Sequence, residues 1–184
     1  MPRAGLSPAA VVDAALAVLD GGGPDALTLA AVAKRTGVAV PSLYKHVRSL
    51  GELRVLVGAR LVEDLAERLG AAVMGLSRDD AVAALMRATR AYVREHPHRY
   101  AAMPLDPLHE PAQAEAGQRL MEVFLAVLRG YGLHGADAVH ATRRLRAAVH
   151  GFTSLELAGG FGLPEDLDDS YQRLIAMVTA SLPA

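Results

Sequence analysis

The stretch Leu27–Val47, LTLAAVAKRTGVAVPSLYKHV, decides the fold that the sequence predicts. Three apolar residues at spacing i, i+3 and i+4 share one face of its first helix: Leu29, Val32 and Ala33. Thr28 precedes that face, and its hydroxyl can accept a hydrogen bond from a free N–H group of the first turn. Gly37 interrupts the pattern at a position that suits a positive φ. We therefore expect a short helix that ends in a tight turn.

A second helix is predicted to begin at Pro41, because the first helical position needs no N–H donor. Leu43 and Val47 are four residues apart in that helix and should point into the core. Small polar, cationic and aromatic groups remain on the other side: Ser42, Lys45 and His46. This composition is typical of a helix that enters the major groove of DNA with its N-terminus first.

At these residues the sequence resembles the TetR family of bacterial transcription regulators. The shared signature is, in order, Leu27-Thr28, Val32-Ala33, Gly37-Val38 and Leu43-Tyr44-x-His46-Val47. The match to the N-terminal domain of the family covers approximately residues 7–60. The resemblance implies a helix-turn-helix DNA-binding domain, which we place at residues 1–50, and a ligand-binding and dimerisation domain at residues 51–184.

The rest of the chain predicts an all-α protein of about nine helices, because no segment shows the alternation of a strand. Ser7-Pro8 begins the first helix, and Gly21–Pro24 ends it. Further helices are expected over residues 51–69, 77–96, 111–131, 136–158 and 166–182, with at most one short helix in the proline-rich segment 97–111. Gly21–Pro24 is interpreted as a turn and not as a nucleotide-binding loop, since no lysine follows at the required spacing.

Composition indicates a globular protein. Apolar residues make up 52% of the chain and charged residues 21%, which excludes a disordered protein. The absence of cysteine excludes disulfides, thiolate catalysis and cysteine zinc sites, and it suits the cytoplasm. No apolar run of about 18 residues and no signal-peptide core occurs, so we expect a cytoplasmic protein without a membrane partner. The net charge is −1, with roughly +2 on residues 1–50, which weakly favours DNA binding there.

The candidate DNA contacts lie in and around the second helix: Thr28, Val40, Pro41, Ser42, Tyr44, Lys45, His46 and Arg48. The resemblance implies that Tyr44 and His46 bind phosphates. Lys45 and Arg48 add an attraction that weakens with salt, and Val40 or Pro41 could touch a thymine methyl group. A merely solvated helical face is the alternative interpretation.

The turn after this helix departs from the family pattern. Family members commonly carry lysine or asparagine there, whereas Leu50 and Gly51 occupy part of the turn here. Arg48 or Arg54 would then have to supply the missing phosphate contact.

The segment Arg146–Leu157, RAAVHGFTSLEL, resembles a motif of one TetR C-terminal subgroup in which Trp, His-Gly and Ser-Leu-Glu recur. His150-Gly151 and Ser154-Leu155-Glu156 match, but Arg146 replaces the tryptophan. Glycine inside a helix costs about 1 kcal/mol relative to alanine, which a close helix contact or a ligand facing the backbone would justify.

The resemblance also implies a homodimer, in which the last two helices pair with their copies. The predicted interface residues are Phe152, Leu155, Tyr171, Leu174, Ile175 and Val178. A twofold dimer would place two recognition helices about 34 Å apart, or somewhat more, on a palindromic DNA site. Closure of a monomeric bundle is the alternative role for these faces.

Family members bind a small molecule among the helices of the body. The candidate pocket residues combine an apolar wall with a few polar groups: Met86, Thr89, Tyr92, Tyr100, Met103, Met121, Phe124 and His150. They favour an apolar or weakly polar ligand, and the arginines leave an anionic ligand open. Apolar residues at helical spacing can equally be plain core.

A metal site and an enzyme are not expected. His96, His98 and His109, with Glu110 beside the last, lack the spacing of metal ligands on a helix. No motif of a hydrolase, metalloprotease or nucleotide-binding enzyme occurs, and no cofactor is predicted.

The sequence therefore predicts a ligand-responsive transcription regulator, most simply a repressor that binds a palindromic double-stranded DNA operator as a homodimer and is released by a small molecule. An activator, or a regulator that senses nothing, is the nearest alternative. An all-helical carrier or enzyme with a vestigial DNA-binding head is the alternative from another class.

Overall fold

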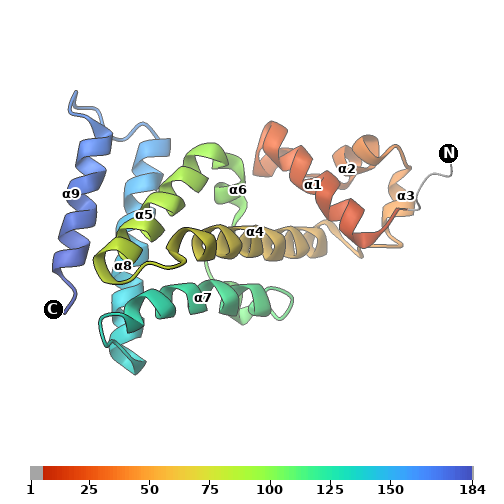
Figure 1. The fold of residues 1–184 in the computed structure, drawn as a ribbon. Coiled ribbons are helices and arrows are strands. Elements are labelled where there is room, and N and C mark those ends of the chain that lie inside the picture. Colours follow the sequence, from red (N-terminus) through yellow and green to blue (C-terminus); the bar gives the residue numbers. More distant parts are fainter. Residues whose placement is uncertain (1–5, 184) are drawn as a thin grey trace. The chain divides into compact units, whose positions relative to one another are not determined.

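The computed structural model describes residues 6–183, and in this range the chain forms nine α-helices and two short 3-10 helices (Figure 1). The α-helices are α1 Pro8–Gly22, α2 Leu29–Thr36, α3 Val40–Leu43, α4 Leu50–Val73, α5 Arg78–Glu95, α6 Pro97–Ala102, α7 Ala114–Arg129, α8 Gly135–Leu157 and α9 Leu167–Ala180. The 3-10 helices are η1 Pro24–Ala26 and η2 Pro107–His109. The described residues contain no strand, which confirms the all-α prediction. None of their helices is both long and apolar enough to cross a membrane.

The caps predicted for α1 and α2 are present in the structure. The Ser7 hydroxyl oxygen accepts a hydrogen bond of 3.1 Å from the N–H group of Ala10 at the start of α1. Thr28 does the same for Ala31 at the start of α2, also at 3.1 Å. Gly37 ends α2 with φ 71° and ψ 26°, a left-handed conformation that costs glycine little.

Helix α3 is shorter than the sequence predicted. It begins at Val40, so Pro41 is its second residue, and regular helix ends at Leu43. Turns continue the chain to His46, and the Val47 N–H group still donates to the Leu43 carbonyl oxygen at 3.0 Å. Leu43 and Val47 therefore both point inward as expected, although only Leu43 lies in the helix proper.

The chain packs as two compact units. The first contains the described residues up to Glu63 together with His96–Gly117, and the second contains Asp64–Glu95 together with the described residues from Gln118 onward. This division differs from the predicted boundary after residue 50, because the first half of α4 and the segment around α6 pack with the N-terminal helices.

The first unit has a continuous apolar core contributed by its N-terminal helices. Its buried members are Val11, Ala14, Ala15, Leu16, Leu19, Leu27, Val32, Ala33, Leu43, Val47, Leu53, Val57 and Leu61. The buried Gln113 also fixes α4, because its side-chain amide donates a 3.0 Å hydrogen bond to the Val55 carbonyl oxygen. This core holds α2 and α3 in place while leaving their outer sides uncovered.

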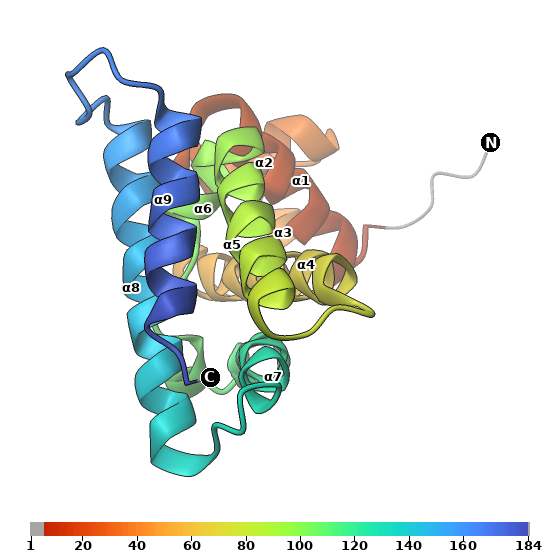
Figure 2. The ribbon, with the colours of Figure 1, turned by 60° about the vertical axis from the view of Figure 1, so that its left-hand side comes forward.

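The second unit contains the second half of α4 together with α5, most of α7, α8 and α9. Helices α8 and α9 lie side by side in both ribbon views, and α5 packs against both of them (Figures 1 and 2). The Tyr171 hydroxyl on α9 donates a 2.7 Å hydrogen bond to the Met86 carbonyl oxygen on α5, inside the core.

The packing of a single chain buries three of the six residues predicted for the dimer interface. Tyr171, Ile175 and Val178 are buried within the second unit of a single chain. Their side chains form the intramolecular core between α9 and its neighbours, so they are not available to a second copy. Leu155 is exposed, while Phe152 and Leu174 are partly exposed.

Candidate nucleic-acid interface

The outer side of α3 and the turn after it carries the predicted DNA contacts. Leu43 is fully buried, whereas the next residue, Tyr44, has 54% of its surface exposed. The structure leaves Thr28, Pro41, Lys45 and Arg48 exposed, and Val40, Ser42 and His46 partly exposed. Neighbouring residues thus divide cleanly between the core and one accessible polar edge.

The backbone of the turn between α2 and α3 is well satisfied. The Gly37 and Val38 N–H groups both bond the Ala33 carbonyl oxygen, the latter at 3.1 Å. The Ser42 N–H group donates to the Ala39 carbonyl oxygen at 2.8 Å. A rigid turn is what a recognition helix needs if its side chains are to meet base edges in a fixed register.

A capping box begins α4 directly after this edge. The Ser49 hydroxyl oxygen accepts a 3.0 Å hydrogen bond from the Glu52 N–H group. In return the Glu52 carboxylate accepts from the Arg48 N–H group, one residue before the usual partner in such a box.

The same carboxylate holds the Arg48 guanidinium. Arg48 Nε lies 3.1 Å and Nη2 3.0 Å from Glu52 Oε1. The hydrogen bond from Arg48 lowers the pKa of Glu52, and the bond to Glu52 raises the pKa of Arg48. Arg48 was among the residues predicted to contact DNA, whereas Glu52 was not, although Ser49-x-x-Glu52 is a recognisable capping pattern.

Comparison with known proteins identifies the family of this chain. Residues 11–53 match the family model described as bacterial regulatory proteins, tetR family, and residues 82–178 match the model of the tetracyclin repressor-like C-terminal domain. The chain belongs to the TetR family. It is a transcription regulator that binds DNA through its helix-turn-helix unit, α2 and α3.

Two relatives support the assignment of this chain to the TetR family. It is 39% identical to the Uncharacterized HTH-type transcriptional regulator Rv0681 of Mycobacterium tuberculosis, over 89% of this chain and 74% of the relative. It is 32% identical to the Uncharacterized HTH-type transcriptional regulator YobS of Bacillus subtilis, over 92% of this chain and 88% of the relative. A solved TetR variant from Acinetobacter baumannii in complex with minocycline has the same fold, with a TM-score of 0.73 at 21% identity and 96% coverage of each chain.

The predicted pocket residues of this TetR-family regulator fall into different environments. Met86, Thr89 and Tyr92 are buried on α5, Met121 and Phe124 are partly buried on α7, and His150 is exposed on α8. The Thr89 hydroxyl donates to the Leu85 carbonyl oxygen of its own helix at 2.8 Å.

Two further pocket candidates, Tyr100 and Met103, belong to the first unit. Met103 packs against the apolar core of the N-terminal helices, which is the plain-core role that the sequence left open.

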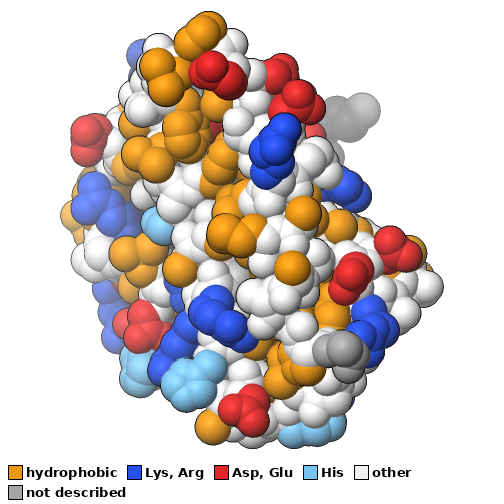
Figure 3. Space-filling view, turned by 90° about the vertical axis from the view of Figure 1, so that its left-hand side faces the viewer, with side chains coloured by type: hydrophobic (Ala, Val, Ile, Leu, Met, Phe, Trp, Pro, Cys, Tyr) orange, Lys and Arg blue, Asp and Glu red, His pale blue; other side chains and the backbone are white. Residues whose placement is uncertain are grey.

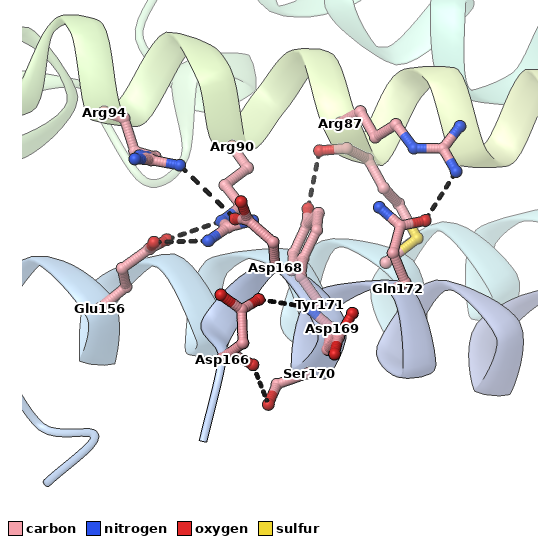
Figure 4. A network of polar contacts seen from close by, with 11 residues as sticks. Arg87, Arg90, Arg94, Glu156, Asp166, Asp168, Asp169, Ser170, Tyr171 and Gln172 are labelled. Carbon is pink, nitrogen blue, oxygen red and sulfur yellow. Dashed lines mark hydrogen bonds and ion pairs between the residues drawn. The ribbon is translucent and has the colours of Figure 1, made fainter. Parts of the chain in front are cut away.

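A polar network that no sequence pattern predicted surrounds a buried arginine of α5 (Figure 4). Arg90 is only 7% exposed and donates to both carboxylate oxygens of Glu156 on α8, at 2.8 and 2.7 Å. Its remaining terminal nitrogen lies 2.7 Å from the Asp168 carboxylate on α9. The guanidinium also lies over the rings of Phe152 and Tyr171, at 5.5 and 4.8 Å from their centroids.

This network joins three helices of the second unit through one side chain. The bonds to Glu156 raise the pKa of Arg90 above its usual value, so the guanidinium stays charged. Arg90 is one of four arginines on α5 and gave no sequence signal of its own, because its two acidic partners lie 66 and 78 positions further along the chain.

The side of α8 and α9 that faces away from α5 displays apolar groups (Figure 3). The exposed large hydrophobic residues of these two helices are Val139, Leu155 and Leu157 on α8 and Met177 on α9. Leu155 and Met177 are 50% and 61% exposed.

The histidines considered as metal ligands are dispersed. Within residues 6–183, no three side chains of His, Cys, Asp or Glu are grouped so as to hold a metal ion. His109 Nδ1 lies 2.7 Å from an Asp106 carboxylate oxygen, and His98 packs against Gly23.

Proposed function

We propose that this regulator is a homodimeric repressor that binds a palindromic operator and leaves it when a small molecule binds to its body. The observation that carries the proposal is the uncovered polar edge of α3 and the turn after it, from Pro41 to Arg48, opposite the buried Leu43 and Val47. A relic domain in a carrier or enzyme would have no reason to keep this edge intact.

The side chains at that edge suit both parts of DNA recognition. Tyr44 and His46 offer donors for phosphate oxygens, and Lys45 and Arg48 offer positive charge. Pro41 and Ser42, in the first turn of α3, suit contact with base edges, with Val40 beside them for a thymine methyl group. Thr28 still has its hydroxyl hydrogen to donate to a phosphate, since its oxygen is the atom that caps α2.

A second copy is needed because one recognition helix touches too few bases to select a site. Twofold pairing through the exposed apolar side of α8 and α9 would supply the second head and cover Leu155 and Met177. Phe152 and Leu174, which are partly exposed, would lie at the margin of that interface.

Release by a ligand is supported by the shared fold of the minocycline-bound TetR variant. The candidate contacts on α5 and α7 are Met86, Thr89, Tyr92, Met121 and Phe124, which suit an apolar or weakly polar molecule. A ligand can empty the operator only by its difference in affinity for the two conformations of the dimer.

Operator binding tests the proposal most directly. The wild-type protein should shift a fragment of its own upstream region in a gel at a salt concentration where unrelated DNA of equal length stays free. Lys45→Gln should weaken binding to both fragments, because it removes a phosphate attraction. Equal, salt-sensitive binding of both fragments by the wild type would favour the carrier or enzyme.

The sign of regulation requires a separate measurement. Transcription from that upstream region by purified RNA polymerase should fall when the regulator is added. A rise in transcript would show that the protein is an activator.

A further inference from the structure

We propose that Glu52 determines how strongly the regulator discriminates its operator from other DNA, by holding Arg48 in a charge-neutral pair at the DNA-binding edge. The inference rests on the proposed role of Arg48 in DNA contact. The inference assigns a function to an acidic residue, Glu52, on a surface proposed to bind DNA, which is itself negatively charged.

The geometry shows how the pair is held. Arg48 is highly exposed and attached at two points to Glu52, through its backbone N–H group and through Nε and Nη2. Glu52 is fixed in turn because its own N–H group donates to the Ser49 hydroxyl. The guanidinium therefore has a preferred orientation on the surface even before DNA arrives.

The pair leaves part of the guanidinium available. Arginine has five N–H donors in a planar fork, and the bonds to Glu52 occupy Nε and one N–H of Nη2. The Nη1 group and the other hydrogen of Nη2 remain directed away from the carboxylate. A phosphate in the correct register can accept from that outer edge without separating the pair.

Non-specific complexes lack that register and depend on net charge. Their affinity comes almost entirely from phosphate neutralisation and counterion release. An Arg48–Glu52 pair has no net charge, so it contributes little to loosely bound DNA. The directed hydrogen bond survives only where the phosphate is correctly placed, which is how the pair favours the operator.

The cap of α4 does not require a negative charge on residue 52. Glutamine serves equally at this position of a capping box, because its side-chain oxygen accepts the same backbone hydrogen bond. Glu52→Gln therefore removes the negative charge while keeping the local fold. The charge, and not the cap, is what the variant tests.

The experiment measures the affinity of the full-length wild type and of Glu52→Gln for the operator fragment and for unrelated DNA across a salt series. For unrelated DNA, the slope of log affinity against log salt should steepen by up to about 0.9 for each bound head, with several-fold tighter binding near 0.1 M salt. Operator affinity should rise by a smaller factor, so the ratio of the two affinities should fall.

Glu67→Gln is the matched control, because it removes the same charge from an exposed position of the same helix, α4. Its slopes and affinities should equal those of the wild type, and thermal melting should confirm that both variants are folded. An unchanged or smaller slope in Glu52→Gln, or an equal gain for both DNAs, would overturn the role of Glu52. Failure of the wild type to discriminate the operator would instead count against the proposed function.

Discussion

A conservative substitution of Tyr44 tests the proposed DNA-binding edge. Tyr44→Phe removes one hydroxyl from an exposed side chain, so folding should be unaffected. Operator binding should weaken by about 1–3 kcal/mol, because a hydrogen bond to a charged phosphate is lost. A fluorescence titration of labelled operator measures this difference.

The control for this change is Tyr131→Phe in the second unit. Its hydroxyl donates a 2.6 Å hydrogen bond to an Asp79 carboxylate oxygen, so the control should lose stability but keep operator affinity. If both variants bound the operator like the wild type, Tyr44 would have no part in recognition.

Arg90 on α5 pairs with carboxylates of both α8 and α9. Arg90→Met should lower the free energy of unfolding by about 3 kcal/mol, because the largely buried Glu156 carboxylate would lose its partner. Urea denaturation followed by circular dichroism measures the change. Arg87→Met, on the exposed side of α5, should cost less than about 1 kcal/mol. Equal losses in the two variants would contradict the special role of Arg90.

At the scale of elements, the sequence predicted where helices begin and end better than it predicted what covers each apolar face. Thr28 and Gly37 marked the two ends of α2 because each residue type has a specific backbone use. On α9, the periodicity correctly indicated an apolar face through Tyr171, Ile175 and Val178. It could not show that this face is covered by α5 and α8 of the same chain, since a pattern does not name its partner.

The link between α1 and α6 gives a pH-dependent prediction. Arg99 donates to both oxygens of the Asp20 carboxylate at 2.7 Å, and this bonding lowers the pKa of Asp20 below its ordinary 3.8. A depressed pKa stabilises the folded protein above pH 3.8, and the benefit is lost as pH falls through the folded value. Asp20→Asn should therefore melt at a lower temperature than the wild type near neutral pH.

The difference between the two melting temperatures should shrink as the pH falls below 3.8. Differential scanning fluorimetry over a pH series measures it. Asp13→Asn removes the same charge from an exposed position of α1 and controls for a general charge effect. A gap that stayed constant down to the lowest pH would show that the Asp20–Arg99 pair does not supply this stability.

At the scale of the whole chain, the sequence predicted the class of the fold and the exposed polar edge opposite Leu43 and Val47. Both follow from short-range patterns, such as the spacing of Leu43 and Val47 around exposed residues. The composition of the packed units did not follow, because the segment around α6 packs with the N-terminal helices through residues such as Arg99 that are distant in sequence from Asp20. Arg90 and Glu156, which pair in the second unit, are likewise distant from each other in the sequence.

The proposed function requires a dimer for operator selection, and the packing of a single chain determines how dimerisation must be tested. Substituting Val178 would disrupt the core of a single chain, so loss of the dimer would be uninterpretable. Leu155→Glu with Met177→Glu instead places two charges on exposed positions of α8 and α9, where an isolated chain tolerates them. The double variant should sediment as a folded monomer and lose most of its operator affinity, because a single head retains only half of the contacts. Leu163→Glu, at an exposed position between the two helices, should remain dimeric, whereas an intact dimer in the double variant would place the interface elsewhere.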